Sequence, residues 1–63
     1  MIKEVDRLDI ADGLKELLTK HGFETSNQIM EKEPDELAVT LGTDQYIAKL
    51  IWFAAKNQLD QYK

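Results

Sequence analysis

The sequence predicts an all-α fold, and three observations support this prediction. Apolar residues recur at spacings of three and four, as in the leucines of residues 14–18, which is the period of an amphipathic helix. No segment shows the alternation of apolar and polar residues that is typical of a half-buried strand. Gly22 and Gly42 separate the periodic segments. With 63 residues, we expect a single helical domain over residues 1–63, built as a compact bundle of four to five short helices.

The N-terminal segment is expected to contribute a short helix and the start of a second one. Ile2, Val5 and Leu8 are spaced by three, and charged residues lie between them. This pattern indicates a short amphipathic helix with a narrow apolar stripe, which can cover a core but cannot form one. Asp12 then stands where its side chain can cap a second helix over about residues 13–21.

The end of the second helix and the start of a third are marked by their residue types. Gly22 can adopt the left-handed conformation that ends a helix, after which Phe23 can fold back onto it. Thr25 is followed three residues later by Gln28, which is the pattern of a capping box. We therefore expect a short third helix over about residues 26–32.

Two further helices complete the expected bundle. Pro34 is well tolerated in the first turn of a helix, and Gly42 is expected to end that helix. Thr43 or Asp44 can cap the last helix, which is the most apolar and runs to about Leu59. The expected central stripe of this last helix consists of Ile47, Ile51 and Ala54.

Composition excludes several classes of protein. The chain has no cysteine, so it holds no disulfide, no thiolate metal site and no thiol nucleophile. Its strongest apolar block, residues 46–55, is interrupted by Lys49 and falls far short of the roughly 20 residues that a membrane span needs. The first residues are charged almost at once and lack the apolar region of a signal peptide. We therefore expect a cytoplasmic protein without membrane contact.

No catalytic, metal or cofactor site is predicted. His21 is the only histidine and stands at the expected end of a helix, where a capping or surface role is typical. The acidic residues near Asp9 and Glu33 fall in short turns, where they are expected to cap helices. No nucleophile stands beside a base in the sequence. We therefore expect no enzymatic activity, no cofactor and no small-molecule substrate.

The second half of the chain resembles a helix-hairpin-helix motif. Leu41 and Gly42 form a hydrophobic-glycine turn, and Ala48, six residues after the glycine, would let two helices approach closely. With a weaker partner motif in the first half, the resemblance covers about residues 8–57. The sequence of this segment is similar in style to the acidic repeats of the transcription factor NusA and to the N-terminal domain of strand-exchange recombinases. The resemblance implies a SAM-like helical bundle in a nucleic-acid-processing or transcription-related protein.

The hairpin departs from the nucleic-acid-binding pattern of that family. Such hairpins typically carry two glycines, so that backbone N–H groups can approach a phosphate. Here Thr43 follows Gly42, and Asp44 stands where the second glycine would be. The net charge of −4 also repels a phosphate backbone. Sequence-nonspecific binding to DNA or RNA through Gly42, Thr43 and Lys49 is therefore kept as an alternative to binding a protein.

The aromatic residues of the last helix carry the main functional hypothesis. Tyr46, Trp52 and Phe53 flank an apolar arc that is wider than one helix usually buries in so small a domain. They either close the core beneath the N-terminal helix or stay exposed as a patch that binds a partner. We hypothesise a non-catalytic interaction module that contacts a protein partner through these residues. Self-association, as in the competing resemblance to sterile alpha motif domains, is a further alternative.

Overall fold

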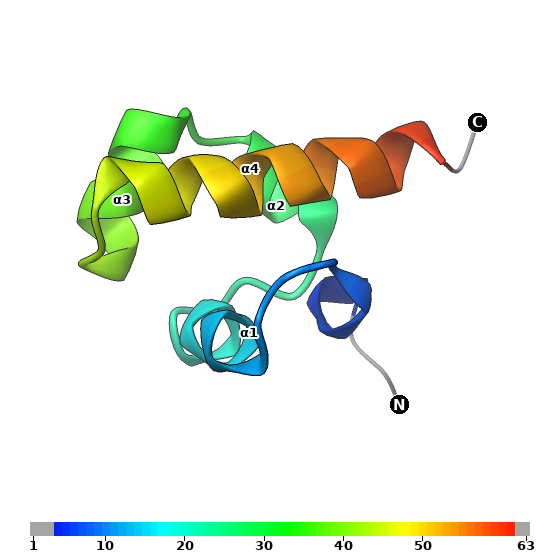
Figure 1. The fold of residues 1–63 in the computed structure, drawn as a ribbon, viewed down its shortest axis with the longest axis horizontal. Coiled ribbons are helices and arrows are strands. Elements are labelled where there is room, and N and C mark those ends of the chain that lie inside the picture. Colours follow the sequence, from blue (N-terminus) through cyan, green and yellow to red (C-terminus); the bar gives the residue numbers. More distant parts are fainter. Residues whose placement is uncertain (1–3, 62–63) are drawn as a thin grey trace.

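The computed structural model describes residues 4–61, which fold into a bundle of helices (Figure 1). A 3₁₀-helix, η1, spans Glu4–Arg7, and the α-helices that follow are α1 (Asp12–Lys20), α2 (Ser26–Met30), α3 (Pro34–Leu41) and α4 (Gln45–Asp60). Residues 4–61 contain no strand. The predicted all-α fold is therefore confirmed for the described part of the chain, whereas the helix-hairpin-helix type stays a prediction.

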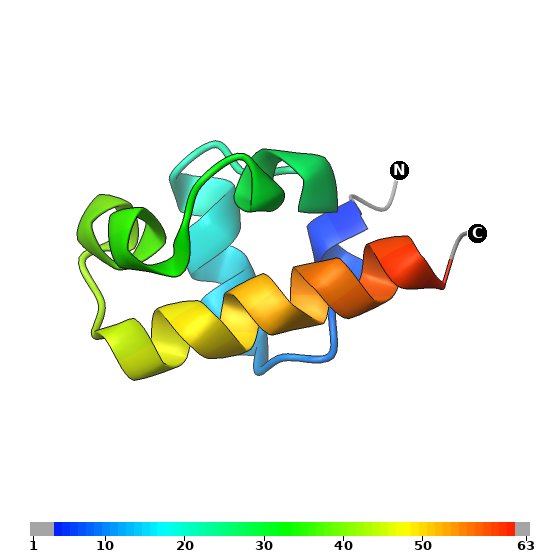
Figure 2. The ribbon, with the colours of Figure 1, turned by 90° about the horizontal axis from the view of Figure 1, so that it is seen from above.

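Helix α4 is the element around which the others pack. It is 16 residues long, and both α2 and α3 contact it. In Figure 2, α2 and α3 lie along one side of α4, and in Figure 1, η1 and α1 lie below it. Ala48, Ile51 and Ala55 on its inward face have no exposed surface. The two alanines let the neighbouring helices approach closely, while Ile51 fills the space between them.

The buried stripe of α4 differs slightly from the expected one. Ile51 is buried as expected, but Ile47 and Ala54 are only partly buried. The centre of the stripe has shifted towards the side of the helix that carries Ala48 and Ala55. We attribute this shift to the small side chains, since α2 and α3 can come closest where α4 presents alanine.

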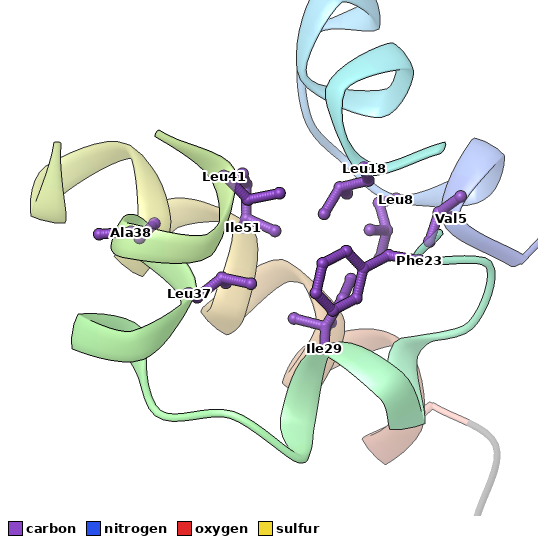
Figure 3. Packing of buried hydrophobic residues seen from close by; sticks show 11 residues of the cluster. Val5, Leu8, Leu18, Phe23, Ile29, Leu37, Ala38, Leu41 and Ile51 are labelled. Carbon is purple, nitrogen blue, oxygen red and sulfur yellow. The ribbon is translucent and has the colours of Figure 1, made fainter. Parts of the chain in front are cut away.

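One hydrophobic core joins the helices. Figure 3 shows the buried side chains pointing into the space between them. The core residues are Val5, Leu8, Leu18, Phe23, Ile29, Leu37, Ala38, Leu41, Ala48, Ile51 and Ala55. Because these residues come from η1, from every α-helix and from the connections between them, each element is held by burial of its own apolar side chains.

Left-handed glycines end two helices, as the sequence predicts. After α1, Gly22 has a φ of 85°, and the Phe23 amide donates to the Leu18 carbonyl oxygen at 2.9 Å. After α3, Gly42 has a φ of 68°, and the Thr43 amide donates back to a carbonyl oxygen of α3 at 3.0 Å. Both turns thus satisfy carbonyl groups that the end of a helix would otherwise leave unpaired.

The start of α1 corrects an expectation. Ala11, and not Asp12, occupies the N-cap position, and it makes no side-chain capping hydrogen bond. The helix begins one residue earlier than expected because the Ala11 carbonyl oxygen accepts from the Leu14 and Lys15 amides. Asp12 instead forms an exposed ion pair with Lys15, with 3.6 Å between Oδ1 and Nζ. The helix predicted from Ile2 is a single 3₁₀ turn within the described residues, and Ile2 itself lies outside them.

The predicted capping box of α2 is confirmed, but the helix is shorter than expected. Thr25 Oγ1 accepts from the Gln28 amide at 3.2 Å, and Gln28 Oε1 accepts from the Thr25 amide at 3.1 Å. The helix ends at Met30, two residues earlier than expected. Glu33 is extended, with a ψ of 159°, because the ring of Pro34 disfavours a helical conformation in the residue before it.

Two glycine substitutions test the account of the turns. A Cβ atom at Gly42 would meet no other atom within 4 Å, so Gly42→Ala changes only the backbone preference. We expect it to lower the free energy of unfolding by about 1 kcal/mol, because a left-handed conformation is unfavourable for alanine. Gly13→Ala is the matched control, since Gly13 lies within α1 and is equally uncrowded.

The control should change stability in the opposite direction. Alanine is the better residue in a helix, and we expect Gly13→Ala to raise the free energy of unfolding by about 0.5 kcal/mol. Urea unfolding followed by circular dichroism measures both effects. Equal effects of the same sign at Gly13 and Gly42 would contradict the role given to the left-handed turn.

Candidate functional site

Helix α4 carries an exposed apolar strip that no other described element covers. Tyr46, Leu50 and Phe53 are 71%, 45% and 53% exposed. Their spacing of four and three residues places them on one face of the helix, facing away from the buried stripe around Ile51. We call these three residues the α4 strip. Among residues 4–61, Val39 is the only exposed large apolar side chain outside the strip.

A groove runs beside the α4 strip. It has a volume of about 350 Å³ and lies between α4 and the segment that joins η1 to α1. Leu50 and Phe53 of the strip line it, so the strip and the groove form one continuous surface. The remaining lining residues are Arg7, Leu8, Asp9, Ala54, Asn57, Gln58 and Gln61.

A buried polar cluster fixes the wall of this groove. Glu4 accepts twice: its carboxylate from the Ser26 amide at 2.7 Å, and its carbonyl oxygen from Gln58 Nε2 at 3.0 Å. The Ser26 hydroxyl donates to Gln58 Oε1. Ser26 has no exposed surface and Gln58 is 8% exposed. The cluster therefore ties η1, the start of α2 and the last turns of α4 together with directional bonds. The bond between Ser26 and Gln58 is buried, and the two bonds of Glu4 are partly buried.

Sequence reasoning missed this cluster. In the sequence, Ser26 is the first residue of the expected third helix, and Gln58 lies near the expected end of the last helix. The available signal is the position of Gln58, which lies seven residues after Ile51 and therefore on the same inward face of α4. Nothing in the sequence indicates that Glu4 hydrogen-bonds to Gln58 and Ser26, because Ser26 and Gln58 lie 22 and 54 residues from Glu4 along the chain.

The structure separates Trp52 from the other two aromatic residues of the hypothesis. Trp52 packs against the core, and its Nε1 donates to the Lys32 carbonyl oxygen at 3.0 Å. Its ring meets the Phe53 ring edge to face, with 5.3 Å between centroids. Lys56 Nζ lies 5.9 Å from the centroid of the Trp52 ring. Trp52 thus has a packing role between α4 and the connection from α2 to α3, whereas Tyr46 and Phe53 face outward.

The Gly42–Asp44 turn has the features expected from the sequence. Asp44 is the N-cap of α4, and its Oδ1 accepts from the Ile47 amide at 2.8 Å. Thr43 is half-buried, and Lys49 is exposed on α4. The Ile47 amide, one of the N–H groups through which the N-terminus of a helix can bind a phosphate group, thus already donates to the Asp44 carboxylate.

Charge is distributed unevenly around the α4 strip. Asp60 is the only acidic residue after Asp44 in the sequence. Lys49 follows Tyr46 by three residues and Lys56 follows Phe53 by three, so both flank the same edge of the strip. Neither lysine forms an ion pair with a carboxylate within residues 4–61. We call Lys49 and Lys56 the lysine edge. Asp60 follows Lys56 by four residues on the same side of α4, so this side keeps one net positive charge although the whole chain carries −4.

The lysines of α1 belong to a different surface. Lys15 and Lys20 line a depression between η1 and α1 together with Asp6, Asp12 and Glu16. The carboxylates offset the positive charge there. The structure therefore does not bring the α1 lysines together with the lysine edge into one basic patch.

The remaining candidate site residue of the sequence, His21, lies at the end of α1. His21 Nδ1 hydrogen-bonds to the Leu17 carbonyl oxygen at 2.9 Å at the end of α1, as a helix cap. Within residues 4–61, no group of three or more His, Cys, Asp or Glu side chains is arranged to hold a metal ion. None of the described helices is both long and apolar enough to cross a membrane.

Comparison with known proteins adds no relative. No protein-family model, curated protein or solved structure matches the chain.

Replacement of Gln58 tests the role of the polar cluster. Gln58→Ala leaves the buried Ser26 hydroxyl and the Glu4 carbonyl oxygen without their partner. We expect the free energy of unfolding to fall by about 2 kcal/mol, and hydrogen exchange at the Ser26 amide to accelerate. Gln61→Ala is the control, because Gln61 lines the groove but is exposed and lies outside the cluster. A similar effect of both substitutions would contradict a specific role for the cluster.

Proposed function

We propose that the chain is a non-catalytic interaction module that binds a protein partner through the α4 strip and the adjoining groove. The observation that carries this proposal is the exposure of Tyr46, Leu50 and Phe53 side by side on one helix. Contiguous exposed apolar residues with a charged rim are typical of protein-binding surfaces, and aromatic residues contribute strongly to their affinity.

Two features support a binding role for the α4 strip over an exposure that is only a by-product of folding. The fold does not need the strip, because the core is closed by the opposite face of α4 and by Trp52. The groove wall is held by the bonds among Glu4, Ser26 and Gln58, so the surface is formed before any partner arrives. A preorganised surface loses less conformational entropy on binding.

A protein is the favoured partner over a nucleic acid. The Asp44 carboxylate accepts from the Ile47 amide, one of the N–H groups at the start of α4 that would otherwise be open to a phosphate group. The net charge of −4 weakens attraction to a polyanion. We place the module in a nucleic-acid-processing or transcription-related protein on the strength of the resemblance to helix-hairpin-helix domains.

Photocrosslinking in cells that express the chain tests this proposal. A photoreactive benzoylphenylalanine replaces Phe53 in the full chain, and protein adducts formed under ultraviolet light are identified by mass spectrometry. Val39 is the matched control position, because it is apolar and 84% exposed but lies on α3 outside the strip. We expect a defined protein adduct from position 53 and none from position 39.

Binding of the identified protein is then measured with purified components. We expect Phe53→Ser to weaken the affinity at least about tenfold, as for a central interface aromatic residue. Tyr46→Ser should weaken binding as well, while it changes the free energy of unfolding by less than about 1 kcal/mol because Tyr46 is exposed. The same adducts from both positions, or adducts with nucleic acid alone, would contradict the proposal.

A further inference from the structure

We propose that the partner presents an acidic amphipathic helix to the α4 strip, with its carboxylates on the side of the lysine edge. This inference rests on the proposed function and adds the chemistry of the bound segment. It is carried by the shape of the surface and by the charges along its two edges.

The shape of the surface fits a helix. The two ends of the α4 strip, Tyr46 and Phe53, are seven residues apart, which is about two helical turns or about 10 Å along the axis. The partner helix would need apolar side chains at the same spacing of three and four residues to match Tyr46, Leu50 and Phe53. The groove beside Phe53 then receives one larger apolar side chain against Leu50 and Ala54. Residues 4–61 offer no sheet edge to which an extended peptide could add as a strand.

The charges differ between the two edges of the surface. On one edge, Lys49 and Lys56 are exposed and are free of ion pairs with carboxylates of residues 4–61. On the groove edge, Arg7 and Asp9 offset each other, beside uncharged Asn57. The complementary helix therefore carries Glu or Asp along one flank of its apolar face and uncharged polar residues along the other.

A second copy of this chain is a poorer occupant of the strip. Two α4 helices packed face to face about a two-fold axis, in antiparallel orientation, would place their lysine edges on the same side of the interface. Lysines of both copies would then adjoin and repel each other, and a parallel pairing would set each lysine edge against a groove edge where Arg7 and Asp9 offset each other. A separate acidic segment has no such conflict, so we assign the surface to a partner and not to a dimer.

Three designed peptides of about 18 residues, long enough to form a helix on binding, test the inference. The first peptide is amphipathic with Glu along one flank, the second has Lys in place of Glu, and the third has the composition of the first in scrambled order. Affinity for the full chain is measured by fluorescence anisotropy at low and at high salt. We expect the first peptide to bind about tenfold more tightly than the second, with a difference that shrinks as salt rises.

A matched pair of charge reversals locates the contact. Lys49→Glu should weaken binding of the Glu peptide about fivefold and strengthen binding of the Lys peptide. Lys20→Glu is the control, because it changes the net charge equally but lies on α1, away from the strip. At a salt concentration of about 0.15 M or above it should leave both affinities within about twofold, since the Debye length is then only about 8 Å and charges on separate surfaces are largely screened.

The outcomes separate this inference from the proposed function. Equal binding of the Glu and Lys peptides, or of the scrambled peptide, overturns the acidic helix. Failure of all three peptides, while photocrosslinking at Phe53 still yields a protein adduct, overturns the inference and leaves the proposed function standing. If sedimentation shows that the chain self-associates and that Phe53→Ser abolishes this, the strip binds a second copy, and the inference of an acidic partner helix is overturned. Absence of any adduct and of any peptide binding overturns both proposals.

Discussion

The packing of one long helix against a small amount of chain is the constraint on which this structure depends. Helix α4 has 16 residues, and it is covered by η1, by three shorter α-helices and by their connections. A domain of this size buries only about 60% of the surface of its unfolded chain. The other elements pack on the face of α4 that carries Ala48, Ile51 and Ala55, because the small alanine side chains there allow neighbouring helices to approach α4 most closely. The opposite face of α4 is left uncovered, and it is the face to which we assign binding.

The polar cluster of Glu4, Ser26 and Gln58 complements this apolar packing. An apolar core holds η1 against the bundle but does not specify its position, since dispersion and burial are not directional. The hydrogen bonds of Glu4 fix η1 to both α2 and α4. They thereby also fix the position of the segment that connects η1 to α1. That connection forms one wall of the groove beside the α4 strip. The shape of the proposed binding surface therefore depends on a buried polar contact some distance from its apolar centre.

Local features could be predicted from the sequence, and features that depend on tertiary contacts could not. The ends of α1 and α3 at Gly22 and Gly42, and the cap of α2 at Thr25, are determined by backbone preferences within a few residues. The two roles of the aromatic residues stayed open, because which flank of α4 is covered depends on where α2 and η1 dock. The structure places Trp52 at the Lys32 carbonyl and leaves Tyr46 and Phe53 exposed.

We assign binding to the outward face of α4 and not to the turn before it. The measurement that tests it most directly is a heteronuclear NMR titration of the ¹⁵N-labelled full chain with the protein identified by photocrosslinking. We expect the largest amide shift changes along the α4 strip, at Tyr46, Leu50 and Phe53, with the Trp52 indole signal little changed. Largest changes at the Gly42–Asp44 turn, with the α4 strip unmoved, would contradict it.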